Sequence, residues 1–268
     1  MRPLVVDSFP FFNELDMLEM RCEEVYDAVD WIVAVEADVT HQGDPKPYHL
    51  SENLDRFDQW KDKLLVVQAT DLPTVGACPD AWSREIAQRE HLTRALASLD
   101  LDGDDIIIHG DVDEIPRAST LWTLRWTPPW KIKGPTTLLQ RGHFWAVDWL
   151  YPPGWEGTVA CKFSDLLAIG SFGDLRNTRR QNPARQCIPD AGWHFSWLGG
   201  ADANLVKVNS FCHPETIRDV TEAVSKGHVY LTEGIHTDGV KLEPVDVDSS
   251  WPAYIAERRC PASWFRPR

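Results

Sequence analysis

The stretch from Ile106 to Pro116 constrains the fold of this chain more than any other. It opens with three consecutive isoleucines and then places three carboxylates, Asp111, Asp113 and Glu114, within four positions before a proline. A short β-branched run of this kind is typical of a buried strand. The sequence therefore predicts a strand inside a sheet whose carboxyl end leads directly into acidic residues.

The spacing of Asp111 and Asp113 suggests a metal site. In an extended segment, residues two apart project to the same side. At roughly 5 Å and an effective dielectric near 20, two such charges repel by about 3 kcal/mol, so we expect a hard divalent cation between them. An acidic turn is the alternative, since Asp-x-Asp also occurs in turn-like sequence, at Asp100/Asp102, Asp102/Asp104 and Asp246/Asp248.

Composition limits the classes of partner. A chain of 268 residues that is 43% hydrophobic can bury a sizeable core, and without a linker or repeat we expect one domain over residues 1–268. The net charge of -14 argues against a nucleic acid as the main partner. The 13 tryptophans are interpreted mainly as core residues, with sugar stacking as the alternative.

Compartment signals point to the cytoplasm. The start of the chain lacks a basic flank followed by an apolar core, and no apolar run reaches about 18 residues, which predicts neither a signal peptide nor a membrane span. The six cysteines are scattered and form no C-x-x-C pair, which favours free thiols over a disulfide scaffold or a zinc ribbon.

Strand and helix patterns alternate before the acidic stretch. Apolar runs predict strands at 4–7, 31–36 and 64–68, and helical stripes begin at Asn13 and cover 80–98. The order β-α-β-β-α-β is typical of a nucleotide-binding half-sheet, although the chain has no glycine-rich phosphate loop. Glu36 also ends a strand, so Glu36 and Asp111 could share one crevice. Lys46 lies in the loop that follows. A solvated side chain is a simpler interpretation of Lys46 than a phosphate contact.

The second half changes character. Shorter strands are predicted at 136–140, 143–149 and 158–163, in an antiparallel section. The segment 177–189 is expected to be a basic loop, either a cover over an anion or simply solvated. Helix signals fade beyond Thr216, and 251–268 is expected to be irregular. Two downstream histidines, His194 and His213, are either structural or the missing third ligand of a metal.

Taken in order, these motifs resemble glycosyltransferase family 17. The resemblance runs from about residue 4 to residue 230 and rests on several stretches together: Asp7-Ser-Phe-Pro-Phe-Phe-Asn-Glu-Leu-Asp16, Val35-Glu36, Lys46-Pro47, the helix with Trp82, Glu85, Gln88 and Arg89, Gly110-Asp-Val-Asp-Glu-Ile-Pro116, Gly192-Trp-His-Phe-Ser-Trp-Leu-Gly-Gly200 and Ser210-Phe-Cys-His-Pro-Glu215.

The resemblance implies an α/β fold of the GT-A type, with a Rossmann-like mixed sheet, helices on both faces and a smaller antiparallel section. It implies a nucleotide-sugar donor bound by about 1–116, UDP-GlcNAc in the known member, an acceptor side at about 117–250, and a divalent ion, Mn2+ or Mg2+. Asp111 and Asp113 match the metal-binding positions, with His213 or His194 as a further ligand. Glu36 matches a position near the nucleoside, and Lys46 and Arg89 match basic positions suited to the donor.

The expected reaction is a single in-line displacement with inversion, in which an acidic side chain takes the proton of the acceptor hydroxyl. The sequence offers four candidates for this base: Glu114, Asp165, Asp174 and Asp190. Without an anchor, a lipid-linked or cell-surface polysaccharide precursor, or a protein, is the expected acceptor. The rival hypotheses are a metal-dependent nucleotidyltransferase, a sugar-nucleotide hydrolase and a non-catalytic carbohydrate-binding protein.

Overall fold

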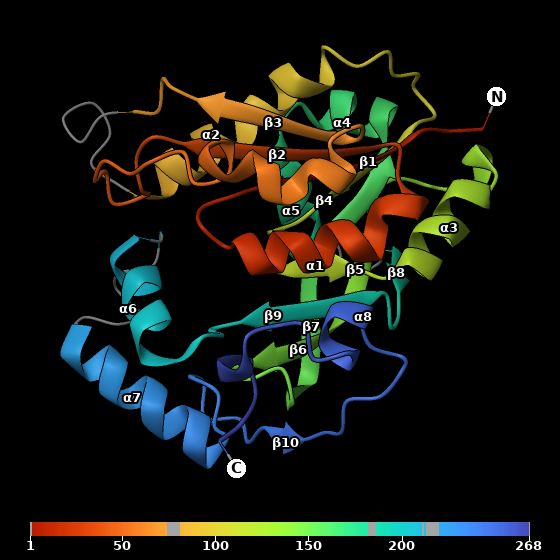
Figure 1. Cartoon of the computed structure of the whole chain (residues 1–268). Helices are drawn as coiled ribbons and strands as arrows, with labels where there is room; N and C mark the ends of the chain where they lie inside the picture. The colour runs from red at the N-terminus through yellow and green to blue at the C-terminus, as the bar shows by residue number, and fades with distance from the viewer. Residues whose placement is uncertain (1, 74–80, 182–185, 211, 213–219, 268) are drawn as a thin grey trace.

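One mixed sheet organises the molecule (Figure 1). The computed structural model describes residues 2–267 apart from 74–80, 182–185, 211 and 213–219. Within these ranges ten strands form the sheet, with the order β3-β2-β1-β4-β7-β6-β9-β5, while β10 pairs with β7 and β8 with β6.

The N-terminal half is a parallel α/β unit. Its elements are β1 (Val5–Pro10), α1 (Leu15–Val25), η1 (Tyr26–Ala28), β2 (Trp31–Ala37), η2 (Ser51–Trp60), β3 (Leu64–Ala69), α2 (Ala81–Leu96) and β4 (Ile106–His109). β1 lies between β2 and β4, and β2 pairs with β3, all in parallel. The predicted β-α-β-β-α-β order is confirmed.

The C-terminal half adds mostly antiparallel pairings. Its elements are β5 (Glu114–Pro116), α3 (Ala118–Trp126), η3 (Pro129–Lys131), β6 (Thr136–Phe144), β7 (Trp149–Lys162), α4 (Phe163–Ile169), α5 (Phe172–Gln181), β8 (Gln186–Ile188), β9 (Gly192–Ser196), α6 (Gly200–Ser210), α7 (Val220–Glu233), β10 (Glu243–Pro244), α8 (Ala253–Ala256) and η5 (Ala262–Trp264). β7 runs antiparallel to β4 and β6, and β9 runs parallel to β6 and antiparallel to β5.

Helices cover both faces of the sheet, as expected for strands that are apolar on both sides. Ile106 and Ile108 of β4 pack into a cluster with Leu18 of α1, whereas Ile107 packs into a second cluster with Leu92 of α2 and Phe172 of α5. The alternation of side chains along β4 therefore joins two separate cores. The predicted α/β class with helices on both faces is confirmed.

The acidic stretch after β4 is a turn, which corrects the expected extended geometry. The Glu114 amide donates a hydrogen bond to the Asp111 carbonyl over 3.0 Å, and β5 begins only at Glu114. Residues in a turn lose the strict alternation of a strand. Asp111 and Asp113 therefore face different neighbours, Arg89 and Arg176 for Asp111 and Lys207 for Asp113.

Several predictions in the second half were wrong. The expected strand 143–149 is split, because Trp145 has φ of 70° and the chain turns there between β6 and β7. Residues 177–181 are the end of helix α5 rather than a loop, and 186–188 form β8. The fading helix signal hid α7, which covers 220–233.

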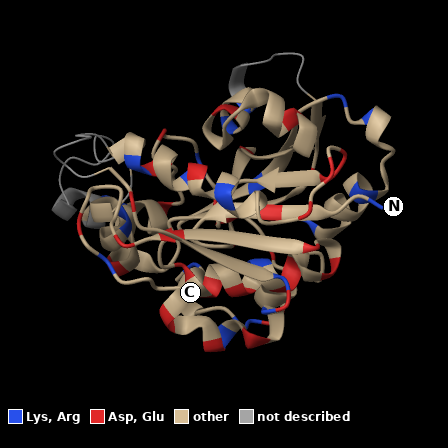
Figure 2. Ribbon diagram, turned by 90° about the horizontal axis from the view of Figure 1, so that it is seen from above, with Lys and Arg blue, Asp and Glu red and all other residues tan. Residues whose placement is uncertain are grey.

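The C-terminal segment is irregular, as expected, but it is not peripheral. Trp251, Tyr254, Ile255 and Trp264 are buried in the same core cluster as α1. The segment therefore closes one face of the sheet. None of the helices in the described ranges combines the length and apolarity that a bilayer crossing requires. Acidic and basic residues are interspersed along the ribbon (Figure 2).

Candidate active site

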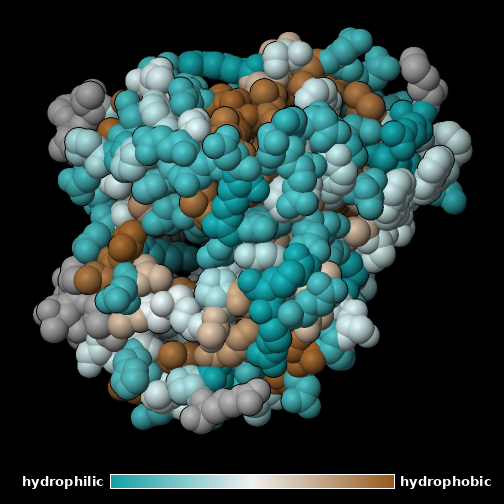
Figure 3. Space-filling model, in the orientation of Figure 1, coloured by the Kyte–Doolittle hydropathy of each residue, from teal (hydrophilic) through white to brown (hydrophobic). Residues whose placement is uncertain are grey.

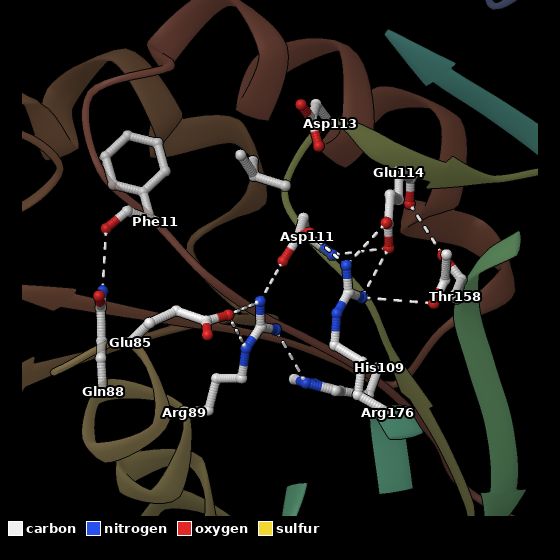
Figure 4. Close-up of polar contacts among 12 residues, drawn as sticks. Phe11, Glu85, Gln88, Arg89, His109, Asp111, Asp113, Glu114, Thr158 and Arg176 are labelled. Atoms are coloured by element: carbon white, nitrogen blue, oxygen red, sulfur yellow. Dashed lines mark hydrogen bonds and ion pairs between the residues drawn. The ribbon is translucent and has the colours of Figure 1, made fainter. Parts of the chain in front are cut away.

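Two arginines hold the first carboxylate of the acidic turn. Arg89 of α2 contacts Asp111 Oδ1, and Arg176 of α5 contacts Asp111 Oδ2 (Figure 4). Arg89 and Arg176 are buried, and Asp111 is one-third exposed. The pKa of Asp111 lies well below its ordinary value because the charges of the two guanidinium groups outweigh its desolvation. Asp111 is therefore a permanent anion that ties α2 and α5 to the end of β4.

Glu114 is the buried centre of the same network. Both of its carboxylate oxygens accept hydrogen bonds from Arg176 at 2.9 Å, and Trp155 Nε1 donates to it at 2.8 Å. The Asp111 amide also donates to Glu114 Oε2 at 2.9 Å. Despite its burial, the cation of Arg176 lowers the pKa of Glu114 to about 2.

His109 completes the network as a neutral residue. Arg89 Nη1 lies 3.1 Å from its Nε2, and the Ser8 carbonyl lies 3.1 Å from its Nδ1. Because a guanidinium only donates, Nε2 must accept and Nδ1 must carry the proton. Burial, and secondarily Arg89, lowers the pKa of His109 well below its ordinary value.

A second set of contacts, made by Arg21, holds the backbone of the turn. Arg21 of α1 forms a fully buried ion pair with Asp7 of β1, with Nη2 at 2.7 Å from Oδ1. Its Nη1 donates to the carbonyls of Asp111 at 2.8 Å and Glu114 at 2.8 Å. The sequence reasoning missed this pair. The available signal was an arginine placed among Leu18, Cys22 and Val25 on the apolar stripe of α1.

Asp113 points away from this network, as Figure 4 shows. Among the described residues, its nearest basic side chains are the Lys207 ammonium of α6, 3.5 Å from Oδ2, and the His194 imidazole of β9, 3.7 Å from Oδ1. Both distances are longer than a good hydrogen bond, so the Asp113 carboxylate keeps acceptor capacity for a ligand. Asp113 also lines a pocket of about 550 Å³.

This pocket, which we call the Asp113 pocket, lies between α1, β9, α6 and the C-terminal segment. In the space-filling view, the surface is hollowed between the start of α1 and α6 (Figure 3). Four aromatic side chains and several polar ones line it: Phe12, Phe195, Trp197, Trp264, Asn13, Glu14, Asp16, Arg56, Asp202, Asn204 and Lys207. A pocket with apolar walls and a few polar groups is the usual form of a small-molecule site.

His194 stands beside the Asp113 pocket. Its ring stacks on Trp155 with centroids 4.2 Å apart and planes 16° apart. Burial lowers its pKa, and its Nδ1 has no hydrogen-bond partner among the described residues. A neutral, oriented imidazole with one unused nitrogen can still serve as a hydrogen-bonding group or a ligand.

The other residues proposed for the donor lie on the parallel half. Both oxygens of Glu36 are engaged by its own chain, through the Leu50 amide at 2.9 Å and the Ser51 amide at 2.8 Å. Glu36 thus fastens the loop after β2. Lys46 lies in that loop with Nζ 5.4 Å from the ring centroid of Phe12, which lines the Asp113 pocket.

The structure does not gather the four candidate bases. Glu114 is fully paired with Arg176 and Trp155. It belongs to the network that Arg89 and Arg176 form with Asp111, Glu114 and His109, which we call the arginine network. Asp174 accepts a hydrogen bond from the Ser171 hydroxyl at the start of α5, and Asp165 accepts one from the Lys162 amide at the start of α4. Asp190 is exposed and pairs with Arg117 at 3.0 Å. None of the four lines the Asp113 pocket.

The described residues do not form a metal centre. No three His, Cys, Asp or Glu side chains within the described ranges are arranged to hold an ion. Both oxygens of Asp111 are occupied by guanidinium groups, which leaves only Asp113 of the pair with free acceptor capacity. His213, the other expected ligand, lies outside the described residues.

A family profile and curated relatives both place this sequence among glycosyltransferases. The sequence profile described as glycosyltransferase family 17 matches residues 1–229. The proteins named beta-1,4-mannosyl-glycoprotein 4-beta-N-acetylglucosaminyltransferase from Rattus norvegicus and Homo sapiens are each 27% identical over 217 residues. The alignment covers 72% of this chain and 40% of each relative, so the chain spans less than half the length of these curated relatives.

Proposed function

This chain belongs to glycosyltransferase family 17, and from that membership we propose that it transfers N-acetylglucosamine from UDP-GlcNAc to a hydroxyl group of a glycan. N-acetylglucosaminyl transfer to a mannosyl-glycoprotein is what the names of its curated relatives state. The enzyme class follows from the family. The sugar, the nucleotide and the acceptor are proposals for this chain.

The architecture supports a fold of the GT-A type. A parallel unit, β3-β2-β1-β4, ends in an acidic turn, and a mostly antiparallel section continues the sheet beyond it. Ligands of open α/β sheets bind outside the carboxyl ends of the parallel strands. The turn from Asp111 to Glu114 stands at such an end, immediately after β4.

The observation that carries the proposal is the placement of Asp113 in a pocket of about 550 Å³ with aromatic walls. The volume falls in the range of ligand sites, roughly 300 to 1,000 Å³. Trp197 and Trp264 provide apolar surfaces on which a sugar ring can pack, while Asp113 and Lys207 provide polar contacts.

The proposed reaction is a single in-line displacement at the anomeric carbon. The acceptor hydroxyl forms the new bond on one side while the diphosphate leaves with its electron pair on the other. The ammonium groups of Lys207 and Lys46 lie at or beside the Asp113 pocket and would offset the charge that develops on the diphosphate. The arginine network would hold the turn rigid during this step.

Divalent metal dependence is proposed separately, from the family resemblance of the Asp-x-Asp motif. The described residues do not by themselves gather a set of ligands for such an ion. Asp113 is the carboxylate of the pair that would be free to bind Mn2+ or Mg2+.

A thermal-shift screen tests the donor. A ligand that binds only the folded state increases the free energy of unfolding, by about 2.7 kcal/mol at a concentration 100 times its Kd, and so raises the melting temperature. We expect UDP-GlcNAc to give the largest shift in a panel of nucleotide sugars, each measured with and without MnCl2. If no nucleotide sugar shifts the melting temperature under either condition, the proposed donor class is wrong.

A further inference from the structure

The Asp113 pocket contains a carboxylate that the family motifs did not single out as catalytic. Glu14 lines the pocket at the start of α1. One of its oxygens, Oε2, accepts hydrogen bonds from the Phe12 amide at 3.1 Å and the Asn13 amide at 3.0 Å. No hydrogen bond to Oε1 occurs among the described residues, so one oxygen is fixed by the backbone and the other remains available.

A second, independent feature marks the pocket as a ligand site. Asn204 of α6 lines it, is 4% exposed, and has no hydrogen-bond partner for its Oδ1 within the described part of the chain. A buried amide oxygen without a partner is destabilising, and a ligand hydroxyl would supply the missing hydrogen bond. Asn204 and Glu14 thus offer two acceptors to a molecule rich in hydroxyl groups.

We propose that Glu14 is the proton acceptor of the transfer reaction, which rests on the proposed function above. Glu14 Oε1 takes the proton of the acceptor hydroxyl as the hydroxyl oxygen bonds to the anomeric carbon. The bond from that carbon to the diphosphate oxygen breaks, and its electron pair leaves with the nucleoside diphosphate. The protonated Glu14 then returns its proton to solvent.

The surroundings of Glu14 suit this role. Desolvation, and secondarily the negative charge of Asp113, raises the pKa of Glu14 above its ordinary value, while Lys207 opposes the shift. A base whose pKa is nearer the working pH transfers protons more efficiently. The other ionisable groups on the pocket wall are Asp16 of α1, Arg56 of η2 and Asp202 of α6, and Arg56 is paired with Asp16.

Exclusion of the other carboxylates supports the choice. Asp16 is neutralised by Arg56, and Glu114 is locked between Arg176 and Trp155 with a pKa of about 2, too low for an effective base. Asp113 has Lys207 and His194 as neighbours and is assigned to the donor. Glu14 is the remaining carboxylate of the wall that is partly buried and not ion-paired among the described residues.

The test is Glu14→Gln, whose side-chain oxygen can still accept the two backbone amides. Full-length protein is assayed with UDP-GlcNAc as donor and methyl β-D-mannopyranoside or water as acceptor, following release of UDP. We expect kcat to fall by about 100- to 10,000-fold, with UDP affinity within about threefold of the parent. The decline of kcat/KM at acid pH, caused by protonation of Glu14, should disappear.

Two further variants keep the result interpretable. Glu14→Asp retains the charge on a shorter side chain. We expect its kcat to be reduced, while the decline of kcat/KM at acid pH, here called the acid limb of the profile, remains. Glu23→Gln removes a carboxylate of helix α1 that pairs with Arg259, and because neither residue lines the pocket, this variant should match the parent. A Glu14→Gln enzyme with kcat within threefold of the parent and the same acid limb overturns the assignment alone. Failure of the parent to release nucleotide from any nucleotide sugar overturns the proposed function as well.

Discussion

At the scale of single residues, Asp111 and Asp113 share a motif but do different work. Asp111 bridges Arg89 and Arg176, two buried cations, whereas Asp113 faces the pocket with one ammonium group, that of Lys207, 3.5 Å away. The difference follows from the turn that begins at Asp111. The two carboxylates should therefore respond differently to the loss of charge.

We predict that Asp111→Asn destabilises the protein and that Asp113→Asn does not. Removing one partner of a fully buried ion pair costs about 3 to 5 kcal/mol, and because Asp111 is one-third exposed we expect about 2 to 3 kcal/mol. Asp113→Asn should stay within about 0.5 kcal/mol of the parent. Urea unfolding followed by circular dichroism measures both values. Equal losses in the two variants would show that the motif acts as one unit.

Sequence reasoning located the acidic stretch but not its geometry. Asp111 and Asp113 were identified because they follow a buried strand, a local signal. Their orientation depends on Arg21, Arg89 and Arg176, which come from three different helices. Contacts at such sequence separations leave no periodic pattern, and for the same reason Glu14 was not recognised as a pocket residue.

At the scale of elements, β7 approaches the acidic turn closely enough to require glycine. A Cβ atom added at Gly157 would lie 2.1 Å from Glu114 Oε1 and 2.4 Å from Trp155 Nε1. These are the atoms of one hydrogen bond, so the methyl group would separate them. Gly157 thus permits the strand, the tryptophan and the carboxylate to meet.

Gly157→Ala should consequently disrupt the network. We predict a loss of at least about 1 to 3 kcal/mol of folding free energy, the usual cost of overpacking. Gly173→Ala is the matched control, because its Cβ would meet only ordinary contacts at 3.9 Å and it lies in helix α5. Alanine there should be neutral or stabilising by up to about 1 kcal/mol. If both variants show the same melting temperature, Gly157 does not have this role.

The predictability of elements differed between the two halves. Strands such as β2 and β4 are continuous apolar runs, and α1 and α2 carry regular stripes, so their patterns are local. α5 was missed because its sequence is strongly polar and it is held mainly by Arg176 and by two buried apolar residues, Phe172 and Leu175. Tertiary contacts, rather than periodicity, determine that helix.

At the scale of the whole molecule, two halves of different character meet at one site. The parallel half supplies Glu14 and, just after β4, Asp113, while the second half supplies Lys207, Asn204 and Trp197. The C-terminal segment closes the pocket through Trp264. The family profile ends at residue 229, before this segment, although Trp264 is buried in the same core as α1.

Calorimetric titration of UDP-GlcNAc, in buffer with MnCl2, tests the central claim that the Asp113 pocket binds the donor. The parent protein should bind UDP-GlcNAc, Asp113→Asn should weaken binding by at least about tenfold, or about 1.4 kcal/mol, and Asp190→Asn should bind as the parent does because Asp190 lies outside the pocket. Repeating the titration with EDTA in place of MnCl2 measures the contribution of the metal. Undiminished binding of UDP-GlcNAc to Asp113→Asn would contradict the account.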